Sequence, residues 1–178
     1  MAITNLNRRN LLNELLRSTL LPWEEEAIEL LGRVWDLDVM PSTDPRHDTA
    51  REDIVRHIIA NDDWDPEYLY LEYVNLRAGP EEDLFRFLEA LVAPDLCDEE
   101  EQRDRVTAIN RHLERDGYHL TRVDDVSGYP VYGVRAQGQG GRGKPRNLIF
   151  AANGPKPEIV VGDALDNEIR IEIGRAHV

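Results

Sequence analysis

The spacing of hydrophobic residues changes its period once along this chain of 178 residues. Up to about residue 113, leucine, isoleucine and valine recur three and four positions apart, which is the period of amphipathic helices that face a core. After Gly117, residues 118–123 and 130–134 alternate apolar with polar positions on either side of a turn-like segment, Asp124 to Gly128, as in a β-hairpin. We therefore predict an α+β fold, with a mainly helical domain over residues 1–135 that closes with a hairpin and is winged-helix-like in shape.

Capping signals place several helix boundaries. Thr49, three positions before Glu52, is expected to open one helix, and Asp98 to open a long one. Gly117 suits the end of that long helix, because glycine adopts the left-handed backbone that terminates helices. Residues 68–74 are rich in aromatic and β-branched side chains, so both helix and strand fit them; we favour helix.

The chain changes character again after the hairpin. Residues 136–146 are rich in glycine and are interpreted as a linker, and residues 147–171 read as the strand-helix-strand start of an α/β unit. The tail, residues 172–178, matches the translation of a common short-read sequencing adapter. We therefore expect the native sequence to end near Arg170 or Ile171, with the rest of the α/β unit truncated.

Composition narrows the class of protein. The formal net charge of −14 disfavours broad, non-specific binding to nucleic acid, because such binding needs a basic surface. It does not exclude a local basic patch. Cys97 is the single cysteine, so no internal disulfide can form. The chain has no apolar run near the ~20 residues of a membrane-spanning helix, and residues 1–9 do not resemble a signal peptide. We expect a cytoplasmic location and no membrane partner.

The segment from residue 50 to residue 64 has the densest set of reactive side chains. Arg51 and His57 fit the loose spacing of helical ribonucleases, but six residues turn a helix by about 600° and place the two on different faces. We therefore expect Arg51, Asp53 and His57 to make surface or helix-end interactions, with Asp53 and His57 as an ordinary i, i+4 pair. Trp64 is interpreted as a core anchor.

The sequence shows no set of histidines and cysteines with the spacing of a metal site. His47 has no second ligand pair beside it, and His112 and His119 lie too far apart in pattern. A structural zinc site needs about four well-spaced ligands, mostly Cys and His, so we predict neither a metal nor another cofactor. Cys97 has no basic neighbour within two residues and is interpreted as an inert thiol. No catalytic residues are assigned.

Two features beyond the hairpin suggest contacts with an anion or a partner. A predicted strand-to-helix turn could hold an anion on its backbone N–H groups, but two prolines remove donors there, so a plain turn is the favoured reading. The linker carries a local basic cluster. The candidate contact residues are Asn153, Gly154 and Lys156 in the turn, and Arg142, Lys144 and Arg146 in the cluster.

Several short motifs occur in an order and spacing that resemble one known family. They are Asp53-Ile-x-x-His57 leading to Asn61-x-Asp63-Trp64, Phe87 to Pro94 with Leu-x-x-Leu-Val-x-Pro, Ile109-Asn-x-x-Leu113 with Asp116-Gly-Tyr-x-Leu120, Gly128-x-Pro-Val-Tyr132, and Asn147 to Glu158 followed by Asp163-Ala-x-x-Asn167. Together they resemble the AbiJ-type N-terminal domain, third subtype, of bacterial abortive-infection proteins. The resemblance extends over nearly the whole chain up to Arg170.

The resemblance implies a helical front module fused to a downstream effector, often nuclease-like, in an anti-phage protein. Such a module would sense a phage-derived or protein trigger, or hold the effector in check. The family supplies no catalytic residues to transfer. We therefore assign no role to the residues of the first motif, which form a family-like signature: Asp53, His57, Asn61, Asp63 and Trp64.

Three functions stay open from the sequence. The first is a non-catalytic sensor or regulatory module. The second is a nucleic-acid-binding module that uses the hairpin, Arg135 and the basic cluster of the linker. The third is a fragment of a nuclease-like effector or another enzyme, with its site after residue 145 near Lys156 and Asp163.

Overall fold

The structure is a computed structural model, and it describes residues 2–138. Predictions for the rest of the linker, the α/β unit and the tail lie outside the described residues. The same holds for the candidate contact residues Arg142, Lys144, Arg146, Asn153, Gly154 and Lys156.

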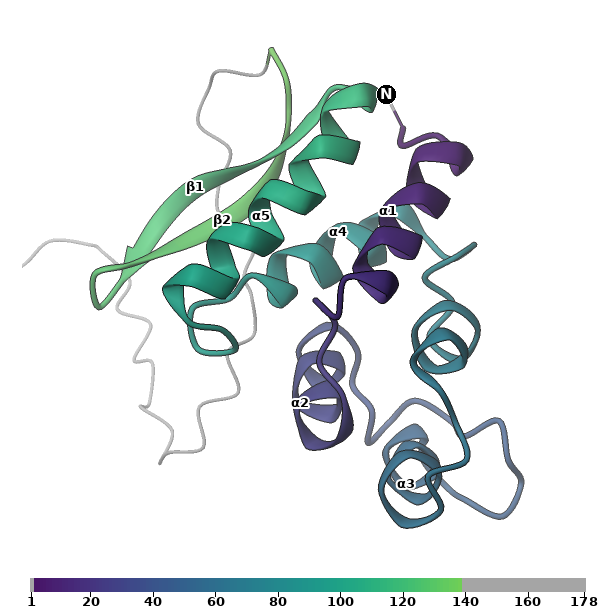
Figure 1. Ribbon diagram of the computed structural model, residues 1–178. Helices are drawn as coiled ribbons and strands as arrows, with labels where there is room; N and C mark the ends of the chain where they lie inside the picture. Colours follow the sequence, from purple (N-terminus) through teal and green to yellow (C-terminus); the bar gives the residue numbers. More distant parts are fainter. Residues whose placement is uncertain (1, 139–178) are drawn as a thin grey trace, which may run out of the picture.

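The described residues form a helical domain that ends in an antiparallel hairpin, as predicted (Figure 1). Two short segments, η1 and η2, are π-helical, and η3 is a 3-10 turn. In chain order the elements are α1 (Asn5–Arg17), α2 (Glu24–Val34), α3 (Ala50–Val55), η1 (Arg56–Ala60), η2 (Tyr68–Tyr73), α4 (Glu81–Leu91), α5 (Glu99–Leu113), η3 (Glu114–Asp116), β1 (Tyr118–Val126) and β2 (Tyr129–Ala136). Residues 68–73 are thus helical, as favoured, and Val74 caps the segment. None of the described helices is long and apolar enough to cross a membrane.

The predicted caps are present and explain where the helices begin. The Thr49 side chain accepts a hydrogen bond from the backbone N–H of Glu52 at 3.3 Å. Asp98 forms a reciprocal capping box with Glu101, which satisfies two N–H groups at the start of α5. Gly117 has φ 76° and follows η3, so the chain leaves the helical region through a left-handed residue and enters β1.

One hydrophobic core joins the helices to the hairpin. Phe87 and Leu88 of α4 are fully buried, and the Tyr70 ring packs against Phe87 with centroids 5.7 Å apart. The Tyr70 hydroxyl donates a hydrogen bond to the Pro22 carbonyl at 2.6 Å, so this polar group is satisfied inside the core. Helix α4 contacts α2 and β2, and α5 contacts both α1 and β1 (Figure 1).

The hairpin turn is shorter than the sequence suggested. Asp124 and Asp125, predicted in a turn, pair with Val131 and Pro130 as part of the ladder, after a bulge at Val123. The turn is formed by residues 127 and 128 alone, with φ of 55° and 88°. Positive φ at both central positions is the geometry that matches the twist of two paired strands, which explains why a two-residue turn replaces the longer one.

Polar contacts attach the hairpin to the helices. The backbone N–H of Val134 donates to Glu89 of α4 at 2.8 Å. The Gln102 amide of α5 donates to the Pro130 carbonyl at 2.9 Å and to the Val92 carbonyl at 2.7 Å. Because Glu89 and Gln102 are buried, these hydrogen bonds fix the position of β2 against the core.

Candidate functional site

The reactive segment of the sequence lies where three parts of the chain meet. The loop between α2 and α3 folds back on itself through a bridge between Pro41 and Thr49. Helix α3 then widens into η1, which is closed by a hydrogen bond from the Asn61 N–H to the Arg56 carbonyl at 3.0 Å. Tyr73 of segment η2 reaches Asp53 of α3, with its hydroxyl 2.9 Å from Asp53 Oδ2. A π-helical turn of this kind is uncommon and frequently marks a functional site.

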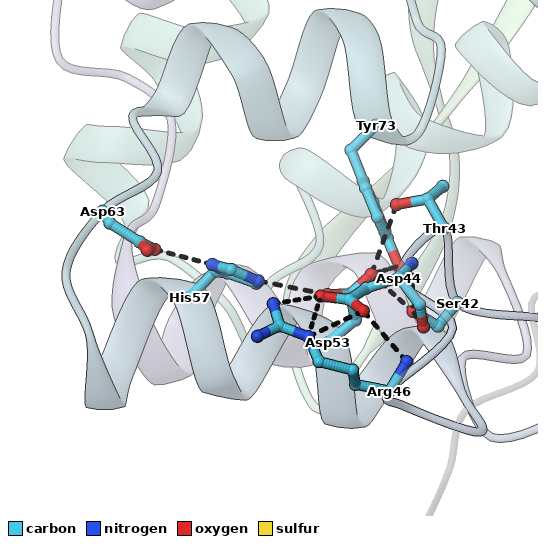
Figure 2. Close-up of polar contacts among 8 residues, drawn as sticks. All are labelled: Ser42, Thr43, Asp44, Arg46, Asp53, His57, Asp63 and Tyr73. Atoms are coloured by element: carbon cyan, nitrogen blue, oxygen red, sulfur yellow. Dashed lines mark hydrogen bonds and ion pairs between the residues drawn. The ribbon is translucent and has the colours of Figure 1, made fainter.

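Asp53 is the centre of the site and is fully buried. One of its carboxylate oxygens, Oδ2, lies 2.7 Å from the Ser42 hydroxyl, 3.3 Å from the Thr43 hydroxyl and 2.9 Å from the Tyr73 hydroxyl (Figure 2). A buried carboxylate needs such donors because it has lost its hydration. Burial, together with the hydrogen bond to Asp53, raises the pKa of Tyr73 well above its usual range. Tyr73 therefore stays protonated as a donor.

His57 lies between two carboxylates. Its Nε2 is 3.4 Å from Asp53 Oδ1, and its Nδ1 is 2.7 Å from Asp63 Oδ1 (Figure 2). The imidazole also stacks on the Trp64 indole, with ring centroids 4.4 Å apart and an interplanar angle of 1°. The ring is thus fixed in position and in orientation by groups on both sides.

The folded-back loop adds a second acid and a second histidine. Asp44 is held by the Arg46 guanidinium, with Nε 3.0 Å from both oxygens and Nη2 2.5 Å from Oδ2. These hydrogen bonds hold the pKa of Asp44 well below its ordinary value. The His47 ring meets the His57 ring edge-on, with centroids 6.4 Å apart. We call Asp44, His47, Asp53 and His57 the Asp–His cluster; one ligand atom from each lies within 4.8 Å of the others.

Most of the family-like signature residues lie close together in the structure, but one of them, Asp53, is more buried than we expected. Asp53, His57, Asp63 and Trp64 converge, whereas Asn61 is exposed and contributes a backbone hydrogen bond at the end of η1. The expected i, i+4 pair of Asp53 and His57 is present, but Asp53 is not at the surface, as one of the two expected environments required. Its face of α3 is covered by the folded-back loop and by η2, so the side chain points inward to their hydroxyls.

The structure also tests the expectations for Arg51 and Trp64. Arg51 forms an ion pair with Asp38 at 2.7 Å, as expected for a surface residue. Trp64 is half-buried and packs against the core, as the anchor prediction required, but it also supports His57.

Sequence reasoning missed the loop residues of the site. His47 has no second ligand pair beside it in the sequence, but the fold of the loop brings it close to Asp53 and His57. The available signal was an aspartate followed by a histidine on two neighbouring segments, Asp44 with His47 three positions later and Asp53 with His57 four positions later. Ser42, Thr43 and Tyr73 gave no such signal, because a hydroxyl in a loop or an apolar run has no distinctive pattern.

The hollow beside the hairpin is not a candidate site of the same kind. It is shallow and is lined by Glu114, His119, Thr121 and Arg135, among others, and His119 Nδ1 lies 3.0 Å from Glu114. Arg122 near the tip forms an ion pair with Asp125. The described part of the hairpin therefore has balanced charges, which is unlike a phosphate-binding surface.

Cys97 behaves as the sequence suggested. Its thiol is half-buried and donates to the Ala93 carbonyl at 3.3 Å. Burial raises the pKa of Cys97, so the thiolate is disfavoured.

Comparison with known proteins identifies a family for this domain. The family model described as AbiJ N-terminal domain 3 matches residues 2–134, which is nearly the whole described domain. No curated protein and no solved structure matches the chain.

Proposed function

The chain belongs to the AbiJ N-terminal domain 3 family, and from that membership we propose that the domain is a non-catalytic sensor or regulatory module of a phage-defence protein. The family name places the domain among abortive-infection, defence-associated modules. Sensing or restraint is the step that we add. The expected partners are an effector domain in the same protein and a phage-derived or protein trigger.

The observation that carries the proposal is the polar connection of three chain segments through Asp53. The carboxylate joins the folded-back loop, α3 and η2 by hydroxyl hydrogen bonds at a buried point. His57 then connects this point to Asp63, whose side chain is 51% exposed. A ligand or partner that acts on the exposed rim therefore reaches a buried junction through two side chains. This is the arrangement that a module needs if binding is to change its own structure.

Segment η1 is the element that we expect to respond. It follows α3 directly and contains His57, while its neighbour Val55 and its own Ile59 are exposed. A π-helical turn is a rare interruption of an α-helix that is frequent at functional sites, so we expect a change at His57 to alter the local arrangement of this segment. The surrounding core gives that change a rigid frame.

A phage challenge tests the proposal. Host cells would produce the complete gene product that contains this chain, either unaltered, without residues 1–135, or with His57→Ala. We expect protection to be lost without residues 1–135, and to be lost or no longer controlled in His57→Ala. His119→Ala, which changes a histidine outside the Asp–His cluster, should protect normally. Unchanged defence after the deletion would refute the regulatory role.

The two alternatives have separate tests. If the chain binds nucleic acid through the hairpin and linker, affinity for duplex DNA should fall steeply with salt, because bound phosphates release counterions. Weak binding that ignores salt would remove that alternative. If the chemistry lies beyond residue 145, Lys156→Ala and Asp163→Ala should each lower nucleotide hydrolysis by the complete product. Unaltered rates would remove the enzymatic alternative.

A further inference from the structure

The Asp–His cluster contains a mixed ligand set that its hydrogen bonds do not fully use. It presents two imidazole nitrogens and two carboxylate oxygens, from Asp44, His47, Asp53 and His57, within 4.8 Å of one another. Nitrogen and carboxylate ligands in fours are typical of protein-bound zinc. The cluster is also uneven in burial: Asp53 is enclosed, while the other three residues are half-buried and so partly accessible to solvent. A small ion therefore has a route to the site.

The carboxylate of Asp53 provides the second, independent observation. Oδ2 contacts three hydroxyls, whereas Oδ1 accepts no hydrogen bond from the described residues, although the residue is 0% exposed. The basic group beside Oδ1 is His57 Nε2, at 3.4 Å. A buried charged oxygen without a donor is costly and calls for an explanation. A bound cation would supply it, with the three hydroxyls holding the carboxylate in the orientation for binding.

His57 has the support that metal-binding histidines usually have. Its Nδ1 is 2.7 Å from Asp63 Oδ1, and in the tautomer that donates from Nδ1 to this carboxylate the Nε2 lone pair is available to an ion. A carboxylate that holds the far nitrogen of a ligating imidazole fixes the tautomer and strengthens the ligand. Stacking on Trp64 fixes the plane of the ring.

The distances fit an ion of zinc size after a small contraction. Ligand atoms about 2.0 Å from a tetrahedral ion lie about 3.3 Å apart. His57 Nε2 and Asp53 Oδ1, at 3.4 Å, already meet this requirement. The 4.8 Å limit of the cluster means that the loop ligands, Asp44 and His47, must move inward. Arg46 now neutralises Asp44, and its side chain is 77% exposed, so an ion can displace it without loss of core packing.

We propose that Asp44, His47, Asp53 and His57 bind one divalent transition-metal ion, for which zinc is the probe. Two imidazole ligands favour zinc and its neighbours over magnesium and calcium, which prefer oxygen. The ion would join the folded-back loop to α3 and η1. This inference concerns metal binding alone, so it stands or falls independently of the regulatory proposal.

Zinc titration of the whole purified chain, after removal of metal by a chelator, is the direct test. We expect one zinc ion per chain by elemental analysis and by calorimetry, with no comparable binding of magnesium. His47→Ala and His57→Ala should each weaken zinc binding by more than tenfold. His47→Ala is the safer variant for folding, because His47 lies in a loop and is half-buried. His119→Ala is the matched control and should bind as the unaltered chain does.

A further variant separates a built site from chance binding by histidines. Asp63→Asn keeps the shape of the side chain that supports His57 but weakens its hold on the ring, and changes of this kind lower metal affinity by about 10–100-fold. Cobalt in place of zinc should give a visible absorption band of four-coordinate cobalt that is lost in His47→Ala. Absence of zinc binding, or equal binding by the unaltered chain and by His47→Ala, would overturn the proposal.

Discussion

Replacement of Asp53 by alanine is the perturbation whose cost can be worked most directly from the contacts. Two of its partners, Ser42 and Tyr73, are close at 2.7 and 2.9 Å, whereas Thr43 is exposed and its hydroxyl lies at 3.3 Å. A hydrogen bond to a charged group contributes about 1.5–3 kcal/mol to stability. Two such bonds are lost, while the cost of burying the carboxylate is relieved. We therefore expect Asp53→Ala to lower the free energy of unfolding by about 3–4 kcal/mol.

Urea unfolding of the metal-free chain, followed by tryptophan fluorescence, would measure this change. Tyr73→Phe removes one of the two strong bonds and should cost about 1.5–3 kcal/mol. The double variant should cost less than the sum of the two single variants, since both remove the same bond. Asp104→Ala, at an exposed position of α5, is the control and should stay within about 0.5 kcal/mol of the unaltered chain. A loss below about 1 kcal/mol for Asp53→Ala, or additive losses, would refute the reasoning.

Three further changes have defined outcomes in the same unfolding assay. Burial raises the pKa of Tyr70, whose hydroxyl donates a hydrogen bond to the Pro22 carbonyl. The contribution of Tyr70 to stability should therefore be complete below the pKa of tyrosine in the unfolded chain, near 10, and should fall as the pH rises above it. Tyr70→Phe should make that fall shallower. The hydrogen bond from Arg33 lowers the pKa of Asp95. The contribution of this ion pair to stability is small because solvent screens it, and it should be present above pH ~4 and lost as the pH falls. Asp95→Asn should lose less stability over the same fall in pH. Phe87→Ala should lower the free energy of unfolding by about 3–5 kcal/mol, because Phe87 is fully buried; a loss near zero would contradict the position given to α4.

The sequence was sufficient for features that are decided locally. The helical stripes, the Asp98 cap and the glycine at residue 117 all act within one turn of chain, so helices followed by a hairpin could be predicted. The hairpin turn was misjudged because Asp124 and Asp125 have turn-like composition, yet they are paired in the ladder. Which of two alternative turns forms depends on register across the strands, and a single strand does not reveal its register.

The site depended on contacts between distant segments. A polar residue such as Asp53 on a helix is usually exposed, and only the fold of the preceding loop buries it. The same loop brings His47 to His57, which no helical spacing predicts. The widening of α3 into η1 was also hidden, since a π-helical turn is a rare response to tertiary packing with no simple sequence pattern.

We propose that the junction of Asp53 and His57, at which the Asp53 carboxylate is buried, controls the response of this defence-associated domain. The most direct measurement is phage plating on cells that produce the complete gene product with His57→Ala or with His119→Ala, at equal protein levels and with equal cooperative unfolding of the two variants. The account predicts that His57→Ala changes protection, either to that of cells without the gene or to uncontrolled toxicity, while His119→Ala protects normally. Normal protection by His57→Ala would contradict it.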